Sequence, residues 1–198
     1  MKLIRDSIRC TAVFVLGLSM LSCQDNFILP IVEQHRTVRT RRPPNLIQNS
    51  SFEVNDQPSL QSWFATYAYI SQDAPPQGGT WSLLLYPSIP EQWAITFVTG
   101  QSGIGVYRLT VWVKSINGWA GTVMLGHWAQ NRFVQSTWTG SDSTQWNAVS
   151  VIDTLSLQPS DTIAVRLSAN GEETSNGFVL FDLVDLERIP QPFGTHRR

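Results

Sequence analysis

Between residues 45 and 189, apolar side chains recur at every second position. The clearest run lies at 107–114, where four apolar residues with odd numbers alternate with Arg, Thr, Trp and Lys. Similar sets lie at 163–167, at 123–125 and at 93–97, the last made of Trp93, Ile95 and Phe97. A period of two is typical of β-strands that turn one face to a core and the other to a wetter environment. We therefore expect strands here, with these alternating apolar sets facing the core.

Turn residues separate these runs. Gly, Pro, Asn and Asp cluster at 75–79, 87–90, 117–118, 139–142, 159–161 and 170–171, and such clusters mark turns and loops. The spacing predicts an all-β fold of about nine or ten short strands, arranged as a two-sheet antiparallel β-sandwich or jelly roll. An up-and-down barrel is the alternative, although several of the connections are long for it.

Composition narrows the class further. The chain has 198 residues, 42% hydrophobic and 15% charged, with eight Trp and nine Phe, which excludes a disordered chain or a coiled coil. It is too short for a (β/α)8 barrel, and its two Cys exclude a disulfide framework and a multi-cysteine zinc site. Residues 45–189 hold five basic and twelve acidic residues, a difference of −7, so nucleic acid is not an expected partner.

The first 22 residues have the pattern of a signal peptide. Lys2, Arg5 and Arg9 precede an apolar stretch at 11–21, which is far shorter than the roughly 20 residues of a membrane-spanning helix. The stretch ends in Met20-Leu21-Ser22-Cys23, which resembles the lipobox of bacterial lipoproteins. The resemblance implies that Cys23 is acylated and becomes the N-terminus, held stably at a membrane by several acyl chains. An ordinary secretory signal or a buried N-terminal helix are the alternatives.

Residues 23–44 are expected to form a basic tether. Their second half, HRTVRTRRPP, carries four Arg and no acid, which favours an extended linker. It either attracts anionic lipid headgroups beside the anchor or serves as a solvated spacer. Residues 190–198 are expected to be a loose tail. Because Gln24 follows Cys23, the enteric sorting rule gives no sign of retention at the inner membrane, and the outer membrane of a bacterial envelope is the expected location.

Four motifs in order carry a family resemblance across nearly all of 45–189. They are NLIQNSSFE at 45–53, GGTWSL at 78–83, YRLTVWVK at 107–114 and GFVLFDLVDL at 177–186. In sequence and spacing they resemble galactose-binding-like jelly rolls, above all the carbohydrate-binding modules that attach to cellulose, xylan and related glucans.

The resemblance implies one structural Ca2+ held by Glu53 and Asp182 together with backbone oxygens, since Ca2+ takes six to eight oxygen ligands. The chain departs from the family where a paired Asp is common, because Leu183 follows Asp182. A turn cap at Glu53 and backbone hydrogen bonds at Asp182 are the alternative.

The tryptophans provide the candidate ligand site. Trp112 is out of phase with the apolar residues of its run and shares a strand face with Arg108, Trp128 is out of phase with Val123 and Leu125, and Trp119 follows a turn. A flat ring beside polar groups can cover the C–H face of a sugar while the polar groups meet its hydroxyls. We therefore expect carbohydrate binding by Trp112, Trp119, Trp128, Arg108 and Arg166, with a Kd between about 1 mM and 10 μM. A core position is the alternative for each ring, and the favoured one for Trp63, Trp81 and Trp93.

The sequence gives little support for catalysis. His127 is the only His of 45–189, and no Gly-x-Ser-x-Gly motif accompanies it. Glu172 and Glu173 are adjacent in a turn-like stretch, so they are not presumed to flank a glycosidic bond. The expected function is a non-catalytic, lipid-anchored envelope protein that binds a polysaccharide or glycan. Two alternatives stay open: a structural or assembly lipoprotein that contacts another envelope protein, and a small jelly-roll enzyme that cleaves glycans.

Overall fold

The computed structural model describes residues 42–86, 92–170 and 177–190. Contacts divide the chain into residues 1–40 and 41–198, and the described residues all belong to the second unit. The signal peptide, Cys23 and most of the tether therefore lie outside the described residues. Within the described part, no helix has the length and apolar character needed to cross a membrane.

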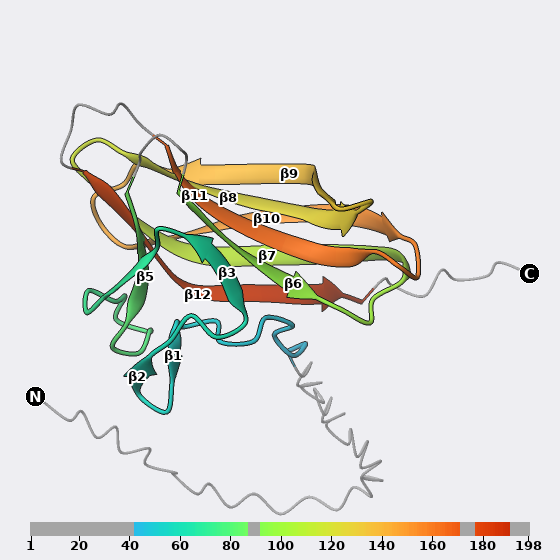
Figure 1. Ribbon diagram of the computed structural model, residues 1–198, viewed down its shortest axis with the longest axis horizontal. Helices are drawn as coiled ribbons and strands as arrows, with labels where there is room; N and C mark the ends of the chain where they lie inside the picture. The colour runs from blue at the N-terminus through green and yellow to red at the C-terminus, as the bar shows by residue number, and fades with distance from the viewer. Residues whose placement is uncertain (1–41, 87–91, 171–176, 191–198) are drawn as a thin grey trace, which may run out of the picture. The chain divides into compact units, whose positions relative to one another are not determined.

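Two antiparallel five-stranded sheets make up the fold, and Figure 1 shows one sheet stacked in front of the other. The front sheet has the order β3-β6-β11-β8-β9 and the rear sheet the order β10-β7-β12-β5-β4, while β1 and β2 form a separate hairpin. The strands are β1 (Glu53–Val54), β2 (Gln57–Pro58), β3 (Trp63–Thr66), β4 (Tyr69–Ser71), β5 (Ser82–Leu85), β6 (Trp93–Val98), β7 (Gly103–Ile116), β8 (Ala120–Ala129), β9 (Arg132–Ser141), β10 (Asn147–Leu157), β11 (Thr162–Asn170) and β12 (Phe178–Ile189).

The all-β jelly-roll prediction is confirmed, with more strands than expected. The sequence predicted about nine or ten strands, and the described residues form twelve. The added strands include β1, β2 and β4, which are only two or three residues long. A strand this short contains too few positions for an alternating pattern to be recognised.

The core lies between the sheets and is built from the alternation that the sequence displays. In β7, Tyr107, Leu109, Val111 and Val113 are fully buried, while the residues between them are more accessible. Val123 and Leu125 of β8 and Ile163 and Leu167 of β11 belong to the same cluster. Side chains on one face of each sheet therefore fill the interior, and the other face of each sheet is left to the outside.

Polar contacts fasten the first described residues to the last strand. The side chain of Asn45 donates to Val184 O (2.9 Å) and accepts from the backbone N–H of Ile47 (3.0 Å) and of Leu186 (2.9 Å). The backbone N–H of Leu46 also donates to Leu186 O (2.8 Å). The segment that opens the domain is thus held against β12, which explains the joint presence of the opening and closing motifs.

Candidate functional site

The outward face of the front sheet holds a row of large side chains. Cross-strand partners in this sheet run from Phe64 to Ile95, then to Arg166, Met124 and Trp138. Partners directly opposite each other on neighbouring strands share a face. All five strands of the sheet therefore contribute one residue to a single line across its outer surface, and the line ends in the exposed rings of Phe64 (64%) and Trp138 (61%).

Further rings lie beside this row and contact one another edge to face. The ring centroids of Phe64 and Phe97 are 5.6 Å apart, and those of Phe97 and Trp128 are 5.4 Å apart. Together with Trp93, Ile95, Phe133 and Arg166, these rings line a hollow of about 480 Å3. We call this surface the front groove. Its volume lies in the range of about 300–1,000 Å3 that is typical of ligand sites.

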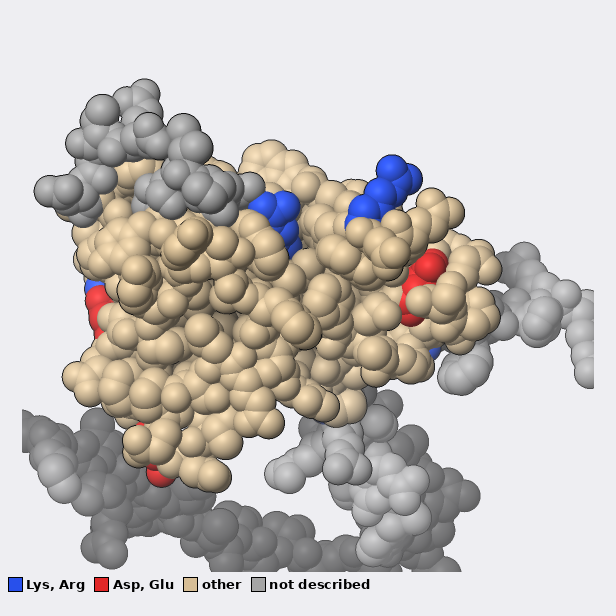
Figure 2. Space-filling model, in the orientation of Figure 1, with Lys and Arg blue, Asp and Glu red and all other residues tan. Residues whose placement is uncertain are grey.

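Arg166 supplies the charge of the front groove. Of the seven described residues that line the groove, Arg166 is the only charged one. Its guanidinium carbon lies 5.7 Å from the centroid of the Trp93 ring, a cation–π arrangement that holds both groups in place. The corresponding face of the space-filling view is mostly free of charge, with Lys and Arg confined to small patches (Figure 2). The groove thus combines flat apolar rings with one guanidinium group.

Two of the predicted ligand residues, Trp128 and Arg166, lie in this groove. Sequence reasoning missed the other rings, and for Trp93 the expectation of a core position is wrong. In β6 the outward residues are Trp93, Ile95 and Phe97, which line the groove, whereas Ala94 and Val98 belong to the core. Alternation alone predicted the right pattern but the wrong face, because this strand is apolar on both sides.

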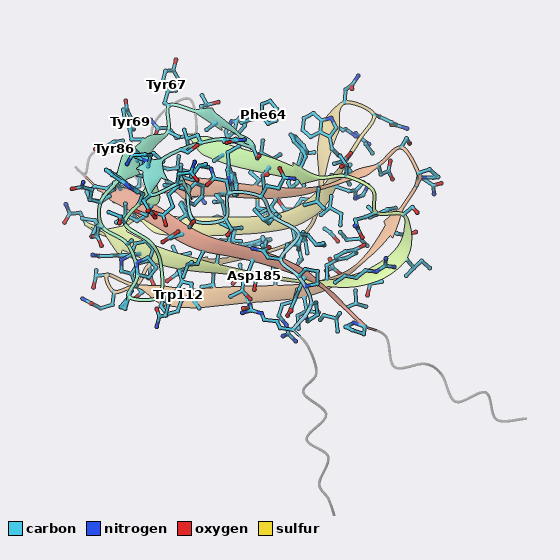
Figure 3. The ribbon with its side chains drawn as sticks, turned by 90° about the horizontal axis from the view of Figure 1, so that it is seen from below. Phe64, Tyr67, Tyr69, Tyr86, Trp112 and Asp185 are labelled. Atoms are coloured by element: carbon cyan, nitrogen blue, oxygen red, sulfur yellow. The ribbon has the colours of Figure 1, made fainter. Side chains whose placement is uncertain are left out.

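The other predicted residues do not join this groove. Arg108 and Trp112 belong to β7 in the rear sheet, and Figure 3 shows Trp112 on the opposite side of the sandwich from Phe64. Arg108 forms an ion pair with Glu187 of the neighbouring strand at 3.0 Å. A single site that combines Trp112 and Arg108 with Trp128 and Arg166 is therefore ruled out by the layer between them.

The expectation that Trp119 binds a carbohydrate is wrong for a different reason. It is 1% exposed and belongs to the core cluster, so no face of its ring is open to a ligand. A Cβ on Gly177 would lie 1.5 Å from its ring, which shows how closely the backbone covers it. The signal was present in the sequence: Trp119 has the same parity as Val123 and Leu125, the inward residues of the strand that follows.

Glu53 and Asp182, the expected calcium ligands, lie near each other beneath a glycine-containing loop. Gly79 lies against the Glu53 carboxylate and Gly78 against Asp182 Oδ2, so closely that a Cβ on either glycine would clash. Glu53 accepts from the backbone N–H of Thr80 (3.0 Å). Asp182 Oδ1 accepts from the backbone N–H of Leu183 (2.7 Å), and its Oδ2 is buried with no hydrogen-bond partner in the described part of the chain.

The surroundings of Asp182 oppose its charge. Burial raises the pKa of Asp182 to about 7, the backbone hydrogen bond from Leu183 lowers it in part, and the nearby Glu53 carboxylate raises it further. A cation beside these two carboxylates would reverse this effect. The residues therefore fit a hard cation such as Ca2+, with carboxylate and main-chain oxygens as ligands. Within residues 42–86, 92–170 and 177–190, no group of three or more His, Cys, Asp or Glu is gathered as in a metal cluster.

Solved structures with the same jelly roll include carbohydrate-binding modules. TmCBM61, solved with β-1,4-galactotriose, matches with a TM-score of 0.52 and 14% identity over 74% of this chain and 99% of its own. The xylan-binding CBM22-1 domain of Paenibacillus barcinonensis Xyn10C matches with a TM-score of 0.53 and 13% identity over 76% of this chain and 97% of its own.

The fold also occurs as part of much larger chains. The enzymatically active domain of tailspike protein 4 of bacteriophage CBA120 matches 73% of this chain, with a TM-score of 0.54 and 12% identity. The match covers only 21% of the tailspike chain. No protein-family model and no curated protein sequence matches the chain. The likeness therefore establishes the jelly-roll fold, which this chain shares with the two modules and the tailspike domain, in agreement with the fold expected from the motifs.

Proposed function

We propose that this jelly roll is a non-catalytic module that binds a polysaccharide or glycan along the front groove. The observation that supports this proposal is the gathering of Phe64, Trp93, Phe97 and Trp128 in one hollow, with Arg166 stacked on Trp93. Carbohydrate-binding modules with the same fold, one solved with β-1,4-galactotriose and one that binds xylan, give it independent support.

The chemistry of the groove suits a sugar ring. The C–H faces of a pyranose are apolar and pack against aromatic rings, and each ring contact adds roughly 1 kcal/mol beyond the area that it buries. Arg166 presents a planar guanidinium with N–H donors, which can meet sugar oxygens at the edge of the ring. A few such contacts give a Kd between about 1 mM and 10 μM. The described lining residues contain no carboxylate or imidazole, so the proposal includes no bond-breaking step.

Two ring deletions test the groove. Trp93→Ala and Trp128→Ala, in the full chain solubilised in detergent, are expected to weaken binding by about tenfold or more, which corresponds to about 1.4 kcal/mol. Binding is measured by calorimetry and by affinity gels with soluble xylan, β-1,4-galactotriose and a wider panel of glycans. Tyr67→Ala is the matched control, since Tyr67 is 63% exposed but lies outside the groove. Unchanged binding in both Trp variants, with normal melting curves, contradicts the proposal.

The same assays separate two further functions. The groove is lined by six apolar or aromatic side chains and one Arg, a surface that also suits a protein partner, as in a structural or assembly lipoprotein of the envelope. That function would be favoured if a purified envelope protein binds the chain and no glycan displaces it. Release of new reducing ends from a bound glycan would instead favour a glycan-cleaving enzyme. Glu172 and Glu173, the adjacent carboxylates considered for such chemistry, lie outside the described residues.

We further propose that Glu53 and Asp182 hold one structural Ca2+. The support is the unpartnered buried Oδ2 of Asp182 and the close approach of Gly78 and Gly79 to the two carboxylates. When bound, the cation would neutralise both carboxylates and stabilise the fold. The chain's own part is to tie β1, the loop at 75–80 and β12 together at one point, away from the front groove.

We also propose that the chain is exported and anchored by an acylated Cys23 in a bacterial envelope, more specifically at the outer membrane. The support is the pattern of the first 23 residues and Gln24, together with the basic residues that precede the sandwich. Several acyl chains would give stable anchoring, whereas a single chain would not.

A further inference from the structure

A second hollow lies on the rear sheet and is not explained by the front groove. It has a volume of about 520 Å3, and its lining residues include Arg42, Asn45, Gln77, Thr110, Trp112 and Asp185. We call it the rear hollow. Figure 3 shows Trp112 and Asp185 on the side of the sandwich opposite Phe64.

A bulge in β12 brings the polar part of the rear hollow together. The register between β12 and β7 shifts between Asp182 and Asp185, so Asp182 lies opposite Trp112 and Asp185 lies opposite Thr110. Trp112 and Thr110 face outward. Between them, two residues of β12, Leu183 and Val184, lie opposite a single residue of β7. Leu183, inside the bulge, has a positive φ of 48°. The bulge thereby points Asp185 outward beside Trp112, as bulges commonly redirect a side chain.

The lining chemistry indicates the class of ligand. The Trp112 ring provides a flat apolar surface, Gln77 and Thr110 provide both donors and acceptors, and Asp185 provides an acceptor. Arg42 is paired with Asp185 at the rim, so the hollow has no net charge to select an anion or a cation. Asn45 is already used by the fold through its three backbone hydrogen bonds. A ring-shaped, uncharged ligand with many hydroxyls fits this combination best.

We propose that the rear hollow is a second sugar-binding site, centred on Trp112, which makes the module bivalent. This inference rests on the proposed function of the front groove and adds that each face of the sandwich holds one glycan segment. Because the two sites lie on opposite faces, one short oligosaccharide cannot occupy both. The module would therefore bridge two glycan strands, and a polymer that reaches both sites would bind more tightly than either site allows by itself.

Stoichiometry and bridging test the proposal in the full chain in detergent. With β-1,4-galactotriose or a xylan oligosaccharide, calorimetry is expected to give two sites for the parent and one each for Trp112→Ala and Trp93→Ala. With soluble xylan, the parent is expected to raise turbidity by linking chains, and each single variant is expected to lose this effect. Gln77→Ala, a loop substitution outside the core, is expected to weaken the second site severalfold without changing the melting curve. Ile104→Ala, exposed on the same sheet but outside the hollow, is the control.

The outcomes separate this inference from the proposed function. One site in the parent that is lost in Trp93→Ala and unchanged in Trp112→Ala and Gln77→Ala overturns the second site and leaves the front groove standing. One site that is lost in Trp112→Ala and unchanged in Trp93→Ala overturns bivalency and the front groove together. Absence of binding to every glycan overturns both proposals.

Discussion

The pKa of Asp182 depends strongly on the position of this residue in the fold. Its side chain is fully buried, one oxygen has no described partner, and its pKa rises to about 7, mainly through burial. An unfolded chain releases the same proton near 3.8. The folded state therefore holds a proton over a range in which the unfolded state has lost it.

This difference predicts an unusual pH dependence in EDTA. The contribution of Asp182 to stability is complete below about pH 4 and is lost as pH rises through about 7, because the folded state then has to bury a charge. The loss should be about 4 kcal/mol, since the pKa rises by about three units, from 3.8 to about 7, and each unit is worth about 1.4 kcal/mol. Urea unfolding from pH 4 to 8 measures it.

Asp182→Asn is the matched variant for this measurement. It keeps the shape of the side chain and cannot ionise, so this part of the pH dependence should disappear. Ca2+ should stabilise the parent most above pH 7, where the carboxylate is ionised, and should not stabilise the variant. A parent whose stability rises steadily from pH 4 to 8 in EDTA would show that the carboxylate is better solvated than the structure indicates.

At the scale of elements, the loop at 75–80 connects the hairpin to β12 through the two carboxylates. A Cβ on Gly79 would lie 1.6 Å from Glu53 Oε1. Because that atom ends a flexible side chain, Glu53 can move aside, but it then gives up its place beside Asp182 and its bond from Thr80.

We therefore predict that Gly79→Ala changes stability in EDTA by no more than about 1 kcal/mol and abolishes the increase in Tm on addition of CaCl2. Scanning calorimetry with and without CaCl2 measures both effects. Gly118→Ala is the control, because Gly118 has a positive φ of 79° and open space around its Cβ: it should lower Tm through backbone strain and keep the calcium response. An intact calcium response in Gly79→Ala would place the cation elsewhere.

At the scale of the whole molecule, the sandwich presents different chemistry on its two faces. The front groove lies on one sheet, whereas Arg42, the first described residue, pairs with Asp185 on the other. The described part of the chain therefore begins on the rear side of the sandwich, on the sheet opposite the front groove.

The proposed anchor gives a prediction for the intact protein in a bacterial host. Cys23→Ser removes the only candidate for acylation in the mature chain and should move the protein from the membrane fraction to the soluble fraction, because the anchor energy lies in the acyl chains. Fractionation and mass spectrometry of the N-terminal peptide measure the change. Ser22→Ala, which keeps a small residue before the Cys, should leave the protein in the membrane fraction.

The sequence by itself determined the class of this fold. Strict alternation in β7, β8 and β11, with turn residues between the runs, indicates antiparallel sheets that bury one face of each strand. The long connections favour a sandwich over an up-and-down barrel. Trp119 has an odd number like the inward residues Val123 and Leu125, and this shared parity also predicts that Trp119 is buried. These are local properties, because the side-chain period of a strand is fixed by its backbone.

Only the tertiary structure decided which faces look inward and which residues meet. Trp93, Ile95 and Phe97 alternate as core residues would, yet they line the front groove, since a period of two does not distinguish the two sides of a strand that is apolar on both. Trp112 and Trp128 both lie out of phase with their strands but belong to different sheets. The bulge in β12 places Asp185 beside Trp112, and no pattern along the chain specifies a register shift that depends on pairing with a distant strand.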